Sequence, residues 1–248
     1  MARQIEDLEQ AKAELAAKSR SLALSNADLK EYAYAASHDL QEPVRTIVGF
    51  AQLLKRRYGN RMGPEADEFI AFIVEGAERM RRQINDLLSY ARLDHGEFRL
   101  EPVSMEAVVD EALTGLTGAI AESGAEITRH PLPAVRGSSD ALVRLMHNLV
   151  ANGLKFIAKG EAPRIDISGT VVDGWADIVV RDHGVGIDPQ YRERIFRMFE
   201  RLEPGQYPGS GIGLAICRKV ADMHGGRIWV DSVRGAGATF HIRLPAAS

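Results

Sequence analysis

A histidine followed directly by a carboxylate, His38-Asp39, is a pair near the start of this 248-residue chain that could do chemistry. Neutral imidazole is nucleophilic, and Asp39 can accept the proton of one ring nitrogen while the other attacks. At 100° per helical residue, His38 lies about 200° from Leu40 and faces away from the apolar seam. Pro43 removes one helical hydrogen bond and predicts a bend just after His38. Arg45 shares the face of His38 and can offset negative charge there.

A second candidate set lies on a strongly apolar helical segment. Asn148, Asn152 and Lys155 are spaced i, i+4 and i+7, so one helix face carries all three. Amide oxygens are suitable ligands for Mg²⁺, and a lysine can pair with phosphate. The same spacing also fits an ordinary polar stripe on a half-exposed helix. These three residues therefore indicate a nucleotide site only together with the other motifs.

Asp182 is the last residue of a predicted strand, and Gly184 and Gly186 follow it. A carboxylate at a strand end can accept a hydrogen bond from the amino group of adenine. The glycines let the backbone pass close to a flat base. Taken alone, this motif is also what an ordinary turn looks like.

A glycine cluster opens a later predicted helix, where free N–H groups and the helix dipole favour phosphate. Arg197 and Arg201 precede the cluster and can reach phosphates, although the phenylalanines beside them fit a short helix core equally well. Neither a Gly-Lys-Ser/Thr phosphate loop nor the protein-kinase signature occurs. The cluster consists of Gly209, Gly211, Gly213 and the adjoining Leu214.

The stretch Ser37–Arg45, SHDLQEPVR, resembles the phosphoacceptor motif of sensor histidine kinases, in the variant common among phytochrome-type kinases. The resemblance implies that His38 is the phosphoacceptor and Asp39 its acid/base partner. Glu42 departs from the Thr or Asn that supports phosphatase activity in many of these kinases. The resemblance therefore gives no support for a phosphatase activity of this chain.

The remaining motifs, in their order and spacing, resemble the N, G1, F and G2 boxes of histidine kinases and their relatives in the GHKL ATPase superfamily. The resemblance covers roughly residues 30–244 and implies a Bergerat-type site for ATP and Mg²⁺. Asn152 is then the metal ligand, and Asp182 binds adenine. The Gly209–Gly213 loop surrounds the phosphates, with Asn148 and Lys155 in support. The short segment Arg201–Pro208 also resembles the phytochrome-type lid.

The elements that must position the histidine are helical. Leucines recur every seven residues over residues 1–30, which predicts a coiled coil, with a solitary amphipathic helix as the alternative. One helix is expected to run to about Tyr58 and a second from Pro64 to about His95. A lone hairpin buries its apolar seam poorly, so we predict a four-helix bundle in a homodimer. The leucines are Leu8, Leu15, Leu22 and Leu29.

Past Gly96 helices and strands are mixed, which favours an α/β sandwich of the Bergerat type. We expect helices over 106–122, 140–157 and 213–223, and extended pieces over 98–105, 126–128 and 134–136. A hairpin joins 165–172 to 175–181 at Asp173-Gly174, and strands 227–233 and 239–244 come last. The predicted divisions are a coiled-coil signalling helix (1–30), a dimerisation and histidine phosphotransfer domain (31–95) and a catalytic ATP-binding domain (96–248).

Composition excludes several classes of protein. The net charge of −3 gives no case for nucleic acid as a partner. No run of about 18 apolar residues is present, so no membrane insertion is expected. A single cysteine, Cys217, rules out an intrachain disulfide and suggests the cytoplasm. The histidines and Cys217 lack the spacing of a zinc site.

The sequence thus predicts ATP-dependent autophosphorylation of His38 and transfer to the aspartate of a response-regulator receiver domain. The input is expected from an upstream sensor module or partner outside this chain. Two alternatives stay open at this point. One is a GHKL ATPase with water as acceptor, although such enzymes often carry glutamate where Asn148 stands. The other is a degenerate kinase that serves as a scaffold.

Overall fold

The computed structural model describes residues 40–59, 63–92, 99–158, 160–202, 207 and 209–247. The chain divides between Arg92 and Leu93 into two compact units. Within the described ranges, no helix is both long and apolar enough to cross a bilayer. The predicted coiled coil over residues 1–30 lies outside these ranges.

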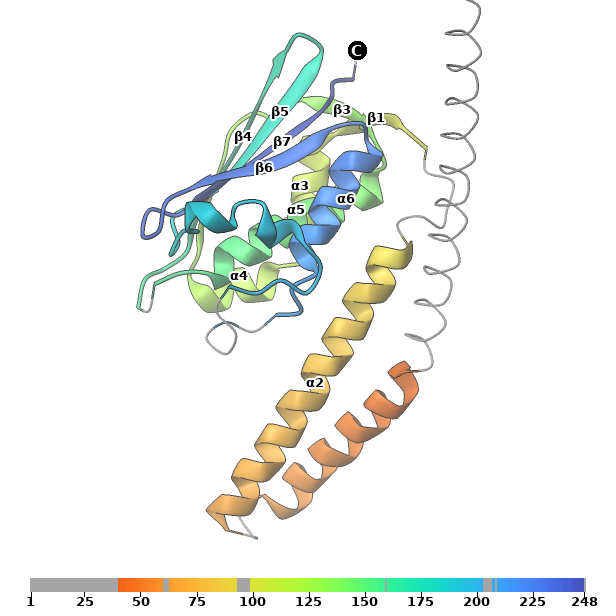
Figure 1. The fold of residues 1–248 in the computed structure, drawn as a ribbon, viewed down its shortest axis with the longest axis vertical. Helices are drawn as coiled ribbons and strands as arrows, with labels where there is room; N and C mark the ends of the chain where they lie inside the picture. Colours follow the sequence, from red (N-terminus) through yellow and green to blue (C-terminus); the bar gives the residue numbers. More distant parts are fainter. Residues whose placement is uncertain are drawn as a thin grey trace, which may run out of the picture. The chain divides into compact units, whose positions relative to one another are not determined.

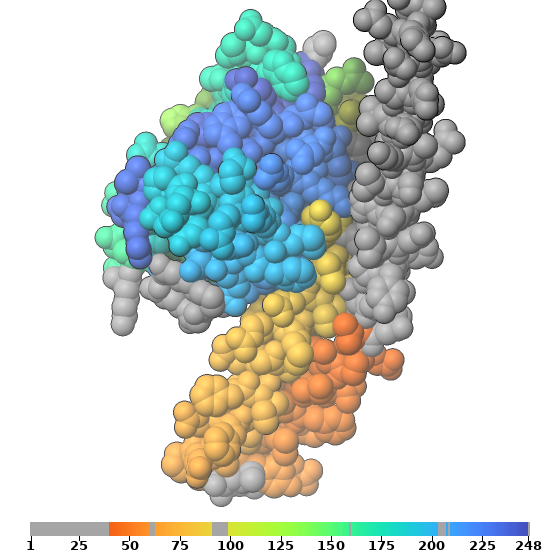
Figure 2. All heavy atoms as spheres, viewed as in Figure 1, coloured from red at the N-terminus to blue at the C-terminus, as the bar shows by residue number. Residues whose placement is uncertain are grey.

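The first unit contains a helical hairpin. Residues 40–58 are helical, and α2 (Pro64–Arg92) follows, with acidic residues in its first turn. The two helices lie against one another (Figure 1; Figure 2, orange and yellow). Their seam buries Val44, Val48 and Ala77, with Ile84 packed against them.

The hairpin buries only part of its apolar pattern. Large side chains flank the seam on both helices and stay 43–61% exposed, so the helices present a second apolar side. The sequence predicts apolar series with a seven-residue repeat on both helices. The series with Leu40, Ile47 and Leu54 and the one with Ile73 and Met80 are exposed. The other series of α2 is inside, because Ile70 and Ala77 are buried and Ile84 packs against the seam. The exposed residues include Leu40, Ile47, Leu54, Phe69, Phe72, Ile73 and Met80.

The second unit is an α/β sandwich, as predicted from the mixture of helices and strands. Five strands lie in the order β2-β4-β5-β7-β6, with β2 parallel to β4 and the other pairs antiparallel. Helices α3, α5 and α6 pack on one face of this sheet (Figure 1). The strands are β2 (Glu126–Arg129), β4 (Arg164–Val172), β5 (Trp175–Asp182), β6 (Arg227–Ser232) and β7 (Ala238–Pro245). The helices are α3 (Met105–Thr114), α5 (Ser139–Lys155) and α6 (Gly213–Met223).

Alternation along the strands shows why the sheet has one covered face. In β5, Ala176, Ile178 and Val180 are buried, while Asp177 and Val179 between them are partly exposed. A side-chain period of two places each set on its own face, and the apolar set faces the helices. The turn between β4 and β5 is the predicted one, because Asp173 and Gly174 both have positive φ (51° and 77°), as a two-residue hairpin requires.

A small second sheet completes this unit, with β1 (Glu101–Ser104) antiparallel to β3 (Ala134–Gly137). The helix expected over 106–122 is two helices, α3 and α4 (Thr117–Ser123). The break buries Leu116, and the Thr114 and Thr117 hydroxyls donate to backbone carbonyls around it. Side-chain bonds of this kind compete with the helix, and Gly115 weakens it further.

Two buried side chains fix α5 and α6 against each other. His224, at the end of α6, accepts a hydrogen bond from the Ser138 N–H (3.0 Å) and donates through Nδ1 to the Val220 carbonyl (2.7 Å). Burial lowers the pKa of His224, which keeps Nε2 available as an acceptor. The Cys217 thiol is fully buried and donates to the Leu145 carbonyl of α5 at 3.7 Å. These contacts join the two helices that carry most of the predicted site.

Candidate functional site

The polar face of α5 is arranged as its spacing predicted. Apolar residues on the opposite side are buried, among them Met146 and Val150, while Asn148, Asn152 and Lys155 are half-buried. The Asn148 amide group donates to the Arg144 carbonyl at 2.9 Å, which orients its oxygen outward from the helix.

Asp182 is a buried carboxylate at the end of β5. Its Oδ1 accepts hydrogen bonds from the backbone N–H groups of Gly184 (3.0 Å) and Ala238 (3.2 Å). Burial raises the pKa of Asp182, and these two bonds oppose that shift. Both bonds end on Oδ1, so Oδ2 is the oxygen available to a ligand.

Two glycines bring this carboxylate close to α5. A Cβ atom at Gly153 would lie 2.8 Å from Ile165 Cδ1 and 3.4 Å from Asp182 Cβ, so the glycine lets the helix pack closely against β4 and the end of β5. A Cβ atom at Gly184 would overlap the carbonyl oxygen of Phe156, just past the end of α5. A Cβ atom at Gly186 would likewise overlap the backbone carbonyl oxygen of Val233. Asp182 and the polar face of α5 therefore belong to one site.

The glycine cluster meets the same face of α5. A Cβ atom at Gly213 would lie 3.0 Å from Asn148 Oδ1, and one at Gly209 would lie 2.8 Å from Lys155 Nζ. Gly211 has a φ of 77° and lies against the backbone of Phe199 and Glu200. Leu214 is half-buried in the first turn of α6.

The N-terminus of α6 is suited to an anion. Its N-cap residue, Ile212, makes no side-chain capping bond, so the first N–H groups of the helix lack a side-chain partner at that position. Lys155 adds a positive charge at the adjoining end of α5. Burial, and then the charge of Arg201, lowers the pKa of Lys155 to about 8. Uncapped N–H groups and two cations together favour phosphate.

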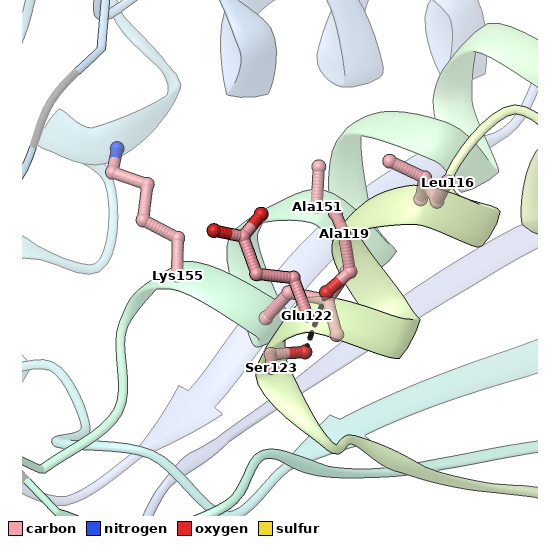
Figure 3. A pocket seen from close by; sticks show the side chains of 7 residues that line it. Leu116, Ala119, Glu122, Ser123, Ala151 and Lys155 are labelled. Carbon is pink, nitrogen blue, oxygen red and sulfur yellow. Dashed lines mark hydrogen bonds between the residues drawn. The ribbon is translucent and has the colours of Figure 1, made fainter.

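A cleft of about 270 Å³ lies between α4 and α5 (Figure 3). Lys155 stands at one end of the cleft and Leu116 at the other. The cleft shares Lys155 with the site but not Asn148 or Asn152, so it lies beside the predicted ligand face. Its remaining lining residues are Ala119, Glu122, Ser123, Ala151 and Leu154.

His38 and Asp39 lie outside the described residues, so their roles stay predictions. Glu42 and Arg45, one and two turns further along the first helix, are exposed. The face assigned to His38 therefore carries exposed polar side chains within the described part of the helix.

Sequence reasoning missed several contributors to the site. The Ala238 N–H reaches Asp182 because β7 pairs with β5, and the two residues are far apart in sequence. Gly153 could have been found from the sequence, because a glycine inside a helix usually has a packing reason. Tyr207 belongs to the segment that resembles a lid, but its contact with Phe156, with ring centroids 5.1 Å apart, was not predicted, because no spacing in the sequence connects these two residues.

Two family models match the chain. The model for the His Kinase A (phospho-acceptor) domain matches residues 28–96, and the model for the histidine kinase-, DNA gyrase B- and HSP90-like ATPase matches residues 137–248.

Individual proteins are also similar to this chain. The chain is 46% identical to Cyanobacterial phytochrome A from Nostoc sp. over 94% of its own length and 30% of that protein. It is similar in structure to full-length ShkA in complex with AMPPNP (TM-score 0.66, 28% identity, 88% of this chain and 46% of that one). It also resembles the mycobacterial sensor histidine kinase MprB (TM-score 0.51, 34% identity, 59% and 97%). The chain thus spans about a third of the first curated relatives it matches.

Proposed function

The chain belongs to the sensor histidine kinases, and from this premise we propose that it transfers the γ-phosphoryl group of ATP to His38 within a homodimer. The phosphoryl group then passes to an aspartate of a response-regulator receiver domain. In this proposal residues 1–30 carry the input signal, 31–95 dimerise and hold the phosphohistidine, and 96–248 bind ATP.

One observation carries the ATP assignment: the Gly209–Gly213 loop meets the polar face of α5 directly beside a buried carboxylate. Asp182 accepts from the adenine amino group, and the α6 N-terminus and Lys155 bind the phosphates. The crystal structure of the relative ShkA is of a complex with the ATP analogue AMPPNP, which supports the same ligand here.

The donor set fits a magnesium ion that travels with the nucleotide. Among the described residues, no group of three or more His, Cys, Asp or Glu side chains could hold a metal on its own. The amide oxygen of Asn152 would supply one ligand, and phosphate oxygens and water the rest, as Mg²⁺ prefers. The bound ion would neutralise charge on the β- and γ-phosphate oxygens.

The proposed transfer uses one lone pair of a neutral imidazole. A ring nitrogen of His38 forms a bond to the γ-phosphorus, the bond from that phosphorus to the bridging oxygen breaks, and ADP leaves with the electron pair. Asp39 takes the proton from the other ring nitrogen. Arg45 lies on the same helix face and offsets charge on the phosphohistidine.

The exposed apolar side of the hairpin supports the homodimer. The large hydrophobic residues exposed on these two adjacent helices exceed what a soluble monomer usually presents in one place. A second copy of the hairpin would bury them in a four-helix bundle.

The central test is the chemistry of the product. After incubation with γ-labelled ATP and Mg²⁺, the protein should carry a covalent label that acid removes and base does not, because the phosphorus–nitrogen bond of phosphohistidine is acid-labile. Hydrolysis of ATP without any protein label would contradict the proposal and indicate water as the acceptor.

Lys155 should make nucleotide affinity depend on pH. Raising the pH through about 8 neutralises the lysine in the empty site, so ATP should bind more weakly at pH 9 than at pH 7. Arginine stays charged over this range, so the Lys155→Arg variant serves as the matched control. ATP itself titrates over this range, but equally for both proteins. The ratio of the wild-type dissociation constant to that of Lys155→Arg therefore reports the lysine alone. A ratio that does not change between pH 7 and 9 would contradict this role for Lys155.

A further inference from the structure

Tyr207 contacts the residues that directly follow α5. Its hydroxyl donates to the Ile157 carbonyl at 3.2 Å, and its ring is tilted by 58° against the Phe156 ring. Its own carbonyl accepts from the Arg201 guanidinium at 2.8 Å. One side chain and one carbonyl thus connect Arg201 to the residues just after α5.

Phe156, on which Tyr207 packs, also contacts other residues of the site. The Lys155 ammonium lies 4.0 Å from the centre of the Phe156 ring, in a cation–π contact. The Phe156 carbonyl accepts from the Val185 N–H at 2.9 Å, within the Asp182–Gly186 motif. Tyr207 therefore packs on a residue that contacts both Lys155 of the α5 face and the Asp182–Gly186 motif.

Both cations of the site depend on this arrangement. Arg201 is bonded to the Tyr207 backbone, and Lys155 lies between the Phe156 ring and Gly209, two residues after Tyr207. Their mutual repulsion contributes to the lowered pKa of Lys155. Two positive side chains that repel each other stay close only if other contacts hold them. The contacts of Tyr207 with Arg201 and Phe156 do so here.

We propose that Tyr207 is a positioning residue for the phosphates of the nucleotide, an inference that rests on the proposed ATP site. It holds Arg201, Lys155 and Gly209 in place before ligand arrives, which reduces the ordering cost of binding. It acts through these residues and does not itself touch the reacting atoms. Removal of the ring should therefore weaken ligands that carry phosphates and spare those that carry only the base and sugar.

The test compares ADP and adenosine by calorimetric titration of the full chain. Tyr207→Ala loses the ring contact and the hydrogen bond, so ADP affinity should fall about tenfold, while adenosine affinity stays within about twofold. Tyr207→Phe keeps the ring and should lose about threefold for ADP. In autophosphorylation, Tyr207→Ala should raise the KM for ATP by a similar factor and leave kcat nearly unchanged. Tyr191→Ala, a tyrosine that instead contacts Arg194, is the matched control.

The outcomes separate the two proposals. Equal ADP affinity in wild type and Tyr207→Ala overturns the role of Tyr207 and leaves the ATP site intact. Equal losses for ADP and adenosine also overturn it, because they indicate general damage to the domain. Wild-type protein that binds neither ligand refutes the proposed function itself.

Discussion

Replacing His38 with glutamine is expected to abolish covalent labelling by γ-labelled ATP. Glutamine keeps a polar, helix-compatible side chain but lacks a ring nitrogen that can attack phosphorus. ATP affinity should not change, because every residue proposed to contact ATP belongs to the second unit. The measurement is the acid-labile label on the protein, together with binding of a fluorescent ATP analogue.

The control for this experiment is His95→Gln, which makes the same exchange at a histidine outside the phosphoacceptor motif. It should label as strongly as wild type. Label that survives in His38→Gln would move the acceptor to another residue and refute the phosphotransfer assignment, whatever the state of the ATP site.

The second large effect concerns recognition of the base. Asp182→Asn should reduce ATP affinity by about 10- to 100-fold, since a hydrogen bond to a charged group contributes roughly 1.5–3 kcal/mol. Gly184 and Ala238 both donate to Oδ1. The amide of the variant must therefore point its oxygen at them, and its NH₂ group then faces the adenine amino group, donor against donor.

This geometry also predicts a change in preference. Guanine carries an oxygen where adenine carries its amino group, so the side-chain amide of the variant can donate to it. The ratio of GTP to ATP affinity should therefore rise in Asp182→Asn, as measured by titration with each nucleotide. Asp177→Asn is the matched control, because Asp177 lies on the same strand but pairs with Arg243. An unchanged ratio would remove Asp182 from base recognition.

Much of the second unit could be predicted because its signals are local. Helix α6 begins at Gly213 and ends at Met223, as the sequence pattern indicated, and Asp173-Gly174 forms the expected turn. The spacing of Asn148, Asn152 and Lys155 also placed them correctly on one face of α5. Each of these features depends on helical or strand periodicity over a few residues.

The features that sequence reasoning missed depend on tertiary contacts. The break between α3 and α4 occurs where Leu116 becomes buried, which outweighs the helical pattern of the flanking residues. The predicted apolar series of Leu40, Ile47 and Leu54 stays exposed beside the seam of Val44, Val48 and Ala77, because the angle at which two helices meet decides which apolar stripe faces inward. Likewise, Tyr207 reaches Ile157 across 50 residues of sequence.

The burial of Cys217 between α5 and α6 has a practical consequence. Its thiol is the only one in the chain and is inaccessible, and burial raises its pKa. An alkylating reagent can reach it only when the two helices separate, so the rate of modification reports local opening of this layer. Because the same helices frame the proposed ATP site, a bound nucleotide would slow that opening. The chain thus carries an intrinsic chemical probe of ligand occupancy that needs no added label.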